Sequence, residues 1–358
     1  MIPLTKEPKG SRAKSTRLVS ATFLTAIALA LTACSSGTAP ESAAQDAVKI
    51  NAQMGWVLNA QYGAFELADH EGYWADEGLK VNLMAGGTNA IRGEQALAGG
   101  TADISTSDDL YSIVTAMQAG TDIVVLGAVV QETLSGIVSL ADDPIDSLED
   151  FKGRTIAIDA GAAERYRAAM KFKGIDPKSF NTIATSDPNA LIEGEVSGVG
   201  ALKANQPVQL EQMGYKTHWL SAEALGFPDY NEYIITTRDF LKNNRDAVVG
   251  FMRGLVKGAE RAEAEPELVT KVTLEVYGKD LGQDPDSVIL EAKAMSAVIS
   301  SDYTDKHGLL WIDPAKLGGP ITDSLITLWG LKEVPPVGEI FDASVLTDAY
   351  GGATSLVE

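Results

Sequence analysis

Cysteine and histidine are scarce in this chain of 358 residues, which has one cysteine, Cys34, and three histidines, His70, His218 and His307. One cysteine cannot form a disulfide within the chain or a cysteine-based metal site, and the histidines lie in separate segments without a His-Glu-x-x-His pair. The sequence also contains neither a Gly-x-Ser-x-Gly elbow nor a Walker loop. We therefore expect a protein that is not an enzyme and that carries no cofactor and no metal.

Basic residues are also in short supply, because 29 Lys and Arg stand against 49 Asp and Glu, giving a net charge of −20. Nucleic acid binding needs clustered basic side chains that neutralise phosphates, so nucleic acid is excluded as a partner. The acidity is typical of a soluble surface and says little about the charge of a ligand. Since 45% of the residues are hydrophobic, a substantial core is possible, and the length predicts two lobes.

The N-terminal segment has the pattern of a lipoprotein signal. A basic stretch is followed by an apolar run over 18–31, which is too short for a comfortable membrane span but suits a signal peptide. The run ends in Leu31-Thr-Ala-Cys34, which matches the bacterial lipobox, and residues 35–45 have the composition of a flexible tether. We predict a signal peptide over 1–33, a tether over 34–47 and lipidation of Cys34. An ordinary cleaved signal, or a buried core cysteine, is the alternative.

The stretch from Val48 to Val81 predicts a strand, a loop, a helix and a second strand. Apolar residues alternate over 48–54, helical spacing follows over 64–71, and Gly72 stands where a helix C-cap is expected. In such a unit, ligands bind beyond the carboxyl ends of the strands. The loop at that position carries side chains suited to holding a small molecule, namely Trp56, Asn59, Gln61 and Tyr62.

The chain resembles a known family at these residues. Periplasmic-type solute-binding proteins of the thiamine-pyrimidine-precursor and nitrate/sulfonate/taurine class share the patterns seen here as Trp56-Val-Leu-Asn59 and Gly72-Tyr-Trp-Ala-Asp-Glu-Gly-Leu-Lys-Val81. Segments at 95–105, 145–158 and 191–207 resemble the same family in order and spacing. The resemblance implies an α/β protein with a two-lobe type II periplasmic-binding-protein fold and a ligand cleft between the lobes.

Pattern changes along the chain, read with this resemblance, predict how the lobes are divided. A continuous apolar run over 122–130 is typical of a strand covered on both faces, and the pattern changes after residue 140. A strand near residues 232–237 is expected to return to the first lobe. We therefore assign 48–138 to the first part of lobe 1, 139–230 to lobe 2, and 231–358 to the second part of lobe 1 with the C-terminal helices.

Further candidate ligand contacts stand at predicted strand ends and helix starts. Some have a structural alternative, since Ser107 and Asp108 are equally suited to be N-caps. At the turn over 159–165, alanines replace the hydroxyls that oxyanion-binding relatives use. The candidates beyond the first loop are Asn89, Ser107, Asp108, Gln131, Gly161, Glu164, Asn205, Tyr230 and Asn231.

Together these features predict a lipid-anchored solute receptor of an ABC importer, a monomer on the extracytoplasmic face of a bacterial cell membrane, with permease subunits as partners. Aromatic and amide side chains dominate the candidate loops, where Arg165 is the one basic residue, and they favour a neutral planar heterocycle such as a thiamine pyrimidine precursor. A sulfonate, taurine or nitrate-like anion is the second choice, and a non-transport extracellular sensor is an alternative of another class. The related pyrimidine-synthesising enzymes carry a Cys-rich motif, which this chain lacks.

Overall fold

The computed structural model describes residues 47–87 and 90–357, which belong to one compact unit. The predicted signal peptide, nearly all of the predicted tether with Cys34, and candidate residue Asn89 lie outside the described residues. None of the helices described there is long and apolar enough to cross a membrane.

The first of two five-stranded sheets has the strand order β2-β1-β3-β10-β4. Strand β1 is parallel to β2 and β3, whereas β10 runs antiparallel between β3 and β4. We call this sheet and its helices the first lobe. Its strands are β1 (Val48–Gln53), β2 (Leu79–Met84), β3 (Ile104–Ser107), β4 (Ile123–Val130) and β10 (Asn231–Thr237).

Helices from both ends of the chain surround this sheet. Those before the second lobe are η1 (Ala60–Tyr62), α1 (Gly63–His70), α2 (Tyr73–Asp76), α3 (Gly93–Ala98) and α4 (Leu110–Gln118). Those after it are α8 (Arg238–Asn243), α9 (Arg245–Ala264), α10 (Pro266–Val272), η3 (Thr273–Tyr277), α11 (Pro285–Ser296), α12 (Thr304–His307), α13 (Pro314–Lys316), η4 (Leu317–Ile321), α14 (Thr322–Thr327), α15 (Val337–Ile340) and α16 (Ala343–Tyr350).

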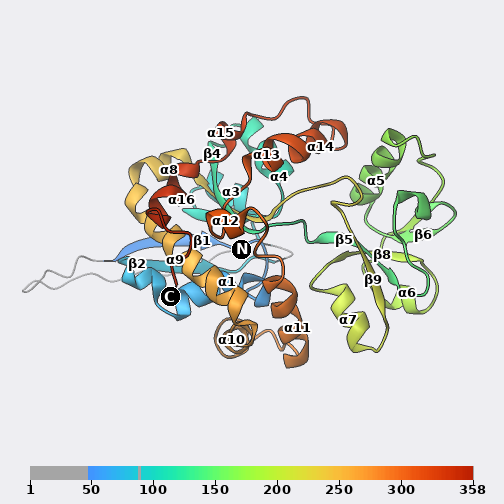
Figure 1. Cartoon of the computed structure of the whole chain (residues 1–358), viewed down its shortest axis with the longest axis horizontal. Helices are drawn as coiled ribbons and strands as arrows, with labels where there is room; N and C mark the ends of the chain where they lie inside the picture. The colour runs from blue at the N-terminus through green and yellow to red at the C-terminus, as the bar shows by residue number, and fades with distance from the viewer. Residues whose placement is uncertain (1–46, 88–89, 358) are drawn as a thin grey trace, which may run out of the picture. The chain divides into compact units, whose positions relative to one another are not determined.

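The second sheet has the order β7-β6-β8-β5-β9 and forms, with its helices, the second lobe. Figure 1 shows its strands beside α5, α6 and α7. The strands are β5 (Ser135–Leu140), β6 (Thr155–Ala157), β7 (Asn181–Ile183), β8 (Gly198–Leu202) and β9 (Thr217–Ser221), and the helices are η2 (Leu148–Phe151), α5 (Ala160–Phe172), α6 (Asn189–Ile192) and α7 (Gln206–Gln212).

Two crossover segments connect the sheets. The chain leaves the first sheet after β4 and enters the second at β5, through residues 131–134, and it returns through 222–230 to β10. The predicted boundary between 138 and 139 therefore falls inside β5. Because Asn231 pairs with Val130 at the sheet edge, both crossovers lie side by side next to the carboxyl ends of β1 and β3.

The core of the first lobe is built on close packing of α9 against α1 and α2. All eight residues of β4 are buried, as the apolar run predicts. On α9, Phe251 stacks on Trp74 with 5.0 Å between ring centroids, and the indole N–H donates to the Phe251 carbonyl. Gly258 allows the closest approach, because a Cβ there would lie 2.1 Å from the Ala64 carbonyl oxygen of α1.

This close approach predicts that Gly258→Ala destabilises the protein even though alanine favours helix formation. The added methyl forces α9 away from α1, and such overpacking costs about 2 kcal/mol or more. Urea unfolding of the variant measures the loss. Gly338→Ala is the matched control, because a Cβ at Gly338 meets no atom within 4 Å. Equal unfolding midpoints for the two variants would contradict the packing argument.

Candidate ligand cleft between the two sheets

A cleft of about 430 Å³ lies where the strand ends of the first lobe face the second lobe. From the first lobe it is lined by Gly55, Trp56, Asn59, Gln61, Asp108, Asp109, Asn231, Glu291 and Trp329. From the crossovers it is lined by Thr133, Leu134, Ala222, Phe227, Pro228 and Asp229, and from the second lobe by Ser135, Arg165, Tyr166, Leu202, Ala204 and Asn205. Its size suits a small solute held on two sides.

The structure brings together six of the residues proposed from the sequence. They come from the loop after β1, the loop after β3, the start of β10 and the end of β8, four segments distant in sequence. Trp56 is 45% exposed, so its ring is available to a ligand. The six residues in the cleft lining are Trp56, Asn59, Gln61, Asp108, Asn205 and Asn231.

The other described candidates lie outside the lining. Tyr62 is fully buried in the first lobe, and Ser107 donates to the Glu94 carboxylate. Gln131 donates to the Ala128 carbonyl, and the hydroxyl of Tyr230 accepts from the Asp313 amide at 3.0 Å. Successive side chains of a strand alternate between its faces, so neighbours at a strand end do not all face the cleft.

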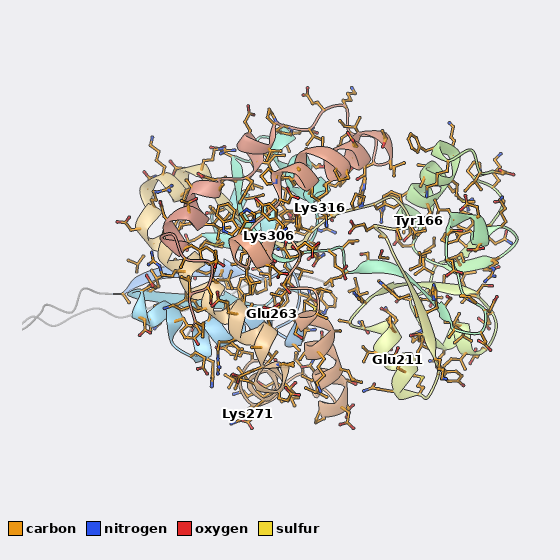
Figure 2. All side chains as sticks on the ribbon, in the orientation of Figure 1. Tyr166, Glu211, Glu263, Lys271, Lys306 and Lys316 are labelled. Carbon is orange, nitrogen blue, oxygen red and sulfur yellow. The ribbon has the colours of Figure 1, made fainter. Side chains whose placement is uncertain are left out.

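Two more candidates, Gly161 and Glu164, belong to the first turns of α5 but do not line the cleft. On the same helix, Arg165 and Tyr166 do, and Figure 2 labels Tyr166. The predicted residues belong to the right helix but stand one and four positions before Arg165. Helical geometry decides which of these neighbours faces the first lobe, and the sequence around 160–166 has no strong apolar pattern that fixes this rotation.

Trp329 was missed as a cleft residue, although it links several aromatic groups. It stacks on Tyr111 with 4.7 Å between centroids and meets Phe227 edge to face at 6.4 Å. The Arg165 guanidinium lies 4.5 Å from its ring centroid, in cation–π geometry. Trp329 therefore contacts the second lobe and a crossover from a segment late in the chain. Its position depends on where the C-terminal helices return, which no local signal shows.

Carboxylates in the cleft fall into two groups, the first of which is structural. Asp109 caps α4 by accepting from the Ser112 amide at 2.6 Å. Asp229 accepts from the Leu110 and Tyr230 amides and from the Tyr233 hydroxyl, the last at 2.6 Å. Burial, and then the neighbouring Asp109, raise the pKa of Asp229 to about 7. These bonds fix the start of α4 against the return crossover.

The second group, Asp108 and Glu291, has fewer partners within the protein. Glu291 on α11 accepts from the Asn59 side-chain amide at 2.6 Å, and burial raises its pKa to about 7. The Asp108 carboxylate is open to the cleft, yet the protein atoms around it desolvate it and raise its pKa to about 6. No local pattern indicates Glu291 as a cleft residue, because α11 follows the first loop by more than 200 residues.

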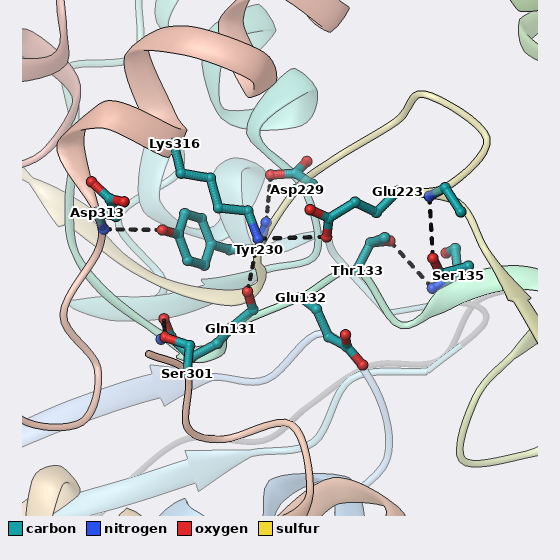
Figure 3. Close-up of polar contacts among 12 residues, drawn as sticks. Gln131, Glu132, Thr133, Ser135, Glu223, Asp229, Tyr230, Ser301, Asp313 and Lys316 are labelled. Atoms are coloured by element: carbon teal, nitrogen blue, oxygen red, sulfur yellow. Dashed lines mark hydrogen bonds and ion pairs between the residues drawn. The ribbon is translucent and has the colours of Figure 1, made fainter. Parts of the chain in front are cut away.

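Lys316 ties the two crossovers to the C-terminal helices. Its ammonium donates to the Gln131 carbonyl at 3.0 Å in the first crossover and lies 3.6 Å from the Glu223 carboxylate in the second (Figure 3). It also lies 4.8 Å from the ring centroid of Tyr230. One cation thus holds both connections between the sheets next to each other. Within the described residues, no group of His, Cys, Asp and Glu is arranged to hold a metal ion.

Two α/β lobes joined by two crossovers around a cleft define the fold of periplasmic binding proteins, as predicted. The family model described as "NMT1/THI5 like" matches residues 59–268. This range is more than half of the chain, so the chain belongs to the NMT1/THI5-like family.

Individual relatives are distant. A formylaminopyrimidine-binding protein of Halalkalibacterium halodurans is 24% identical, over 73% of this chain and 79% of the relative. The riboflavin-binding protein RibY of Chloroflexus aurantiacus is 25% identical, over 70% and 75%. The solved periplasmic sulfonate-binding protein SsuA of Methylobacillus flagellatus has a TM-score of 0.59 at 13% identity, over 86% and 95%, and shows the fold alone. Pyrimidine phosphate synthases, which are enzymes, are also detectably similar.

The raised pKa of Glu291 predicts that stability falls as pH rises. Its pKa is raised from 4.5 to about 7, so the folded protein holds this proton more tightly than the unfolded chain. The resulting stabilisation is complete below pH 4.5 and is lost as pH rises through 7. We expect the free energy of unfolding of the ligand-free protein to fall between pH 5.5 and 8.5. For the Glu291→Gln variant we expect this fall to be about 2 kcal/mol smaller.

Urea unfolding at pH 5.5, 7 and 8.5 measures this difference. The control is Glu195→Gln, which removes an exposed carboxylate outside the cleft and should follow the wild-type profile. A Glu291→Gln profile parallel to that of the wild type would show that Glu291 titrates normally in the folded protein.

Proposed function

We propose that this protein is the lipid-anchored solute-binding component of an ABC importer and that it captures a small planar heterocycle by closure of its two lobes. The observation that supports this most is the composition of the cleft, which has aromatic rings on both sides. Trp56 and Trp329 come from the first lobe and Tyr166 from the second. A flat solute can stack on the exposed Trp56 ring and gains apolar burial against Trp329 and Tyr166.

Hydrogen bonds to the edge of the solute would supply orientation. Asn59, Gln61 and Asn231 offer amides from the first lobe, and Asn205 offers one from the second. A solute held by groups from both lobes stabilises their closed arrangement, because only that arrangement makes every contact. Micromolar affinity, about −8 kcal/mol, is within reach of a stacked ring with several satisfied polar contacts. Closure would then present the loaded protein to its permease.

The relatives' names agree with a heterocycle. Formylaminopyrimidine and riboflavin are both flat nitrogen heterocycles, and they are what the two binding proteins are named for. We propose the same class of ligand, a flat nitrogen heterocycle, for this protein, but neither of these two compounds in particular.

An anion such as a sulfonate, taurine or nitrate is the second candidate, and the cleft disfavours it. Arg165 is the one basic residue in the lining, which also contains the carboxylates of Asp108, Asp109, Asp229 and Glu291. The start of α5, which would otherwise attract an anion, is already capped by its own carboxylate, because Asp159 accepts from the Ala162 amide at 2.9 Å. A bound anion would therefore lie in a cleft whose charged side chains are mostly negative.

The chemistry of the cleft also bears on the enzyme and sensor alternatives. A binding protein needs complementarity alone, whereas the synthases among the relatives need reactive groups. The cleft lining contains neither cysteine nor histidine, which fits a binding role. A sensor would use the same closure without a permease, so genes for a permease and an ATPase beside this one would favour transport.

A ligand panel tests the proposed class. The full-length protein in detergent is freed of bound ligand and then mixed with hydroxymethylpyrimidine-type compounds, taurine, alkanesulfonates or nitrate. We expect thermal stabilisation by the pyrimidines, since a ligand at a hundredfold excess over its Kd adds about 2.7 kcal/mol. Trp56→Ala should weaken binding at least tenfold because it removes a stacking surface.

Phe172→Ala is the control for this experiment. Phe172 is 72% exposed on α5 and does not line the cleft, so its loss should leave binding unchanged. Stabilisation by an anion and by no pyrimidine would overturn the heterocycle while leaving a solute-binding role. No stabilisation by any member of the panel would count against both the heterocycle and the solute-binding role.

The lipid anchor is proposed from the lipobox alone and has its own test. In a bacterial host given a labelled fatty acid, we expect the wild-type chain to carry the label and to fractionate with membranes. Cys34→Ala removes the thiol that forms the thioether, so it should lose the label. Ser35→Ala, one position further on, should keep it. Label on the Cys34→Ala chain would refute lipidation at this site.

A further inference from the structure

The first-lobe side of the cleft is rich in hydrogen-bond acceptors that have no donor. Asn59 and Asn231 both line the cleft with 9% of their surface exposed, and the side-chain oxygen of each accepts no hydrogen bond from the described residues. Buried polar groups in folded proteins are nearly always paired, so unpaired ones beside a cleft indicate groups that a ligand satisfies.

The orientation of these two amides is fixed by their other contacts. The NH₂ group of Asn59 faces the Glu291 carboxylate at 2.6 Å, and that of Asn231 faces the Asp108 carbonyl oxygen at 2.8 Å. Both partners accept hydrogen bonds, and a rotated amide would place oxygen against oxygen. The groups left unpaired are therefore acceptors, so the solute has to present donors to them.

Glu232, the residue after Asn231, carries a carboxyl group that lies behind the cleft lining. Its side chain is fully buried, and neither of its oxygens accepts a hydrogen bond of ordinary geometry from the described residues, although the Gln61 side chain lies close enough to act as a weak donor. Its backbone φ is 51°, a left-handed conformation that is rare for a non-glycine residue. Backbone strain and an unpaired buried acid both cost free energy, and such costs concentrate at functional sites.

The titratable groups that face Glu232 come from three elements: Tyr62 on η1, Asp108 in the loop after β3, and Glu291 on α11. Burial, and then the charges of Asp108 and Glu291, raise the pKa of Glu232, whereas the Gln61 side chain lowers it. Arg165, the basic residue in the cleft lining, lies over Trp329. The first-lobe side of the cleft therefore has the carboxyl groups of Asp108, Asp109 and Glu291 in its lining and that of Glu232 behind it, and no basic residue in that part of the lining.

We propose that the solute is a cation, a flat nitrogen heterocycle that carries an ammonium group and presents N–H donors to Asn59, Asn231 and the carboxylates of Asp108 and Glu291, which line the cleft. This inference rests on the proposed heterocycle function and narrows it. Charge-assisted N–H···O⁻ bonds are about twice as strong as neutral ones, and they strengthen inside a cleft that excludes water. A neutral ring lacking such donors would leave these acceptors unsatisfied.

Two pyrimidines that differ in one group test the charge. The probes are 4-amino-5-aminomethyl-2-methylpyrimidine, an ammonium at neutral pH, and its hydroxymethyl analogue, which is neutral and similar in size. Calorimetry on the full-length protein in detergent at pH 7.5 gives the two Kd values. We expect the ammonium compound to bind at least tenfold more tightly. Its advantage should shrink as pH falls to 5.5, because the carboxylates then take up protons while the ammonium stays charged.

Substitutions locate the charge that is responsible. Glu291→Gln should bring the two Kd values to within threefold of each other by weakening the ammonium compound alone, because it removes a carboxylate of the lining. Asp108→Asn, at an open position, serves as the second variant should Glu291→Gln not fold, and it should narrow the difference in the same direction. Glu66→Gln is the matched control, since Glu66 is fully buried in the first lobe outside the cleft lining and should keep the full difference.

The outcomes separate this inference from the proposed function. If the neutral compound binds as tightly as the ammonium one, or more tightly, the inference of a cationic solute is wrong and the proposed heterocycle function stands. A preference for the ammonium compound that survives both Glu291→Gln and Asp108→Asn also overturns the inference. If neither pyrimidine binds and an anion does, the cation and the heterocycle fall together.

Discussion

The pairing of β10 between β3 and β4 is the constraint on which the cleft depends. Because β10 runs antiparallel to both neighbours, its first residue lies at the edge where β3 and β4 end, with Asn231 opposite Val130 and Tyr233 opposite Ser107. This pairing brings the return crossover against the outgoing one, and Lys316 holds the two together. A different register at this edge would move Asn231 away from Asp108 and separate the two walls of the cleft.

Many of the residues that the loops of the first lobe contribute to the cleft could be predicted from the sequence. Few of those that come from the C-terminal segments could be. Trp56, Asn59 and Gln61 follow a strand directly, and residues beyond strand ends in such units meet ligands, so a local pattern is enough. Glu291 and Trp329 lie on C-terminal segments whose own patterns describe packing. Their arrival at the cleft depends on how the helices after α9 return to the sheet, which is a property of tertiary packing and not of local spacing.

The same limit explains why the charge of the cleft was hard to foresee. The aromatic and amide residues that stand close together in the sequence favour a neutral ring, so the sequence alone predicts a neutral ligand. The carboxylates of the lining reach the cleft separately, Asp108 from a loop and Glu291 from α11, while Glu232 lies behind them on β10. Overall acidity gave no warning, since most acidic residues of such a chain lie on its surface.

The strained, buried position of Glu232 persists because its neighbours hold the backbone firmly. On one side the Asn231 side chain donates to the Asp108 carbonyl, and on the other the Tyr233 hydroxyl donates to Asp229, which also accepts the Leu110 and Tyr230 amides. These bonds connect the start of β10 to the start of α4, so residue 232 cannot relax without breaking them. Keeping an acid buried and its backbone strained costs folding free energy, and such costs concentrate at functional sites, here directly behind the lining residues Asn231 and Gln61.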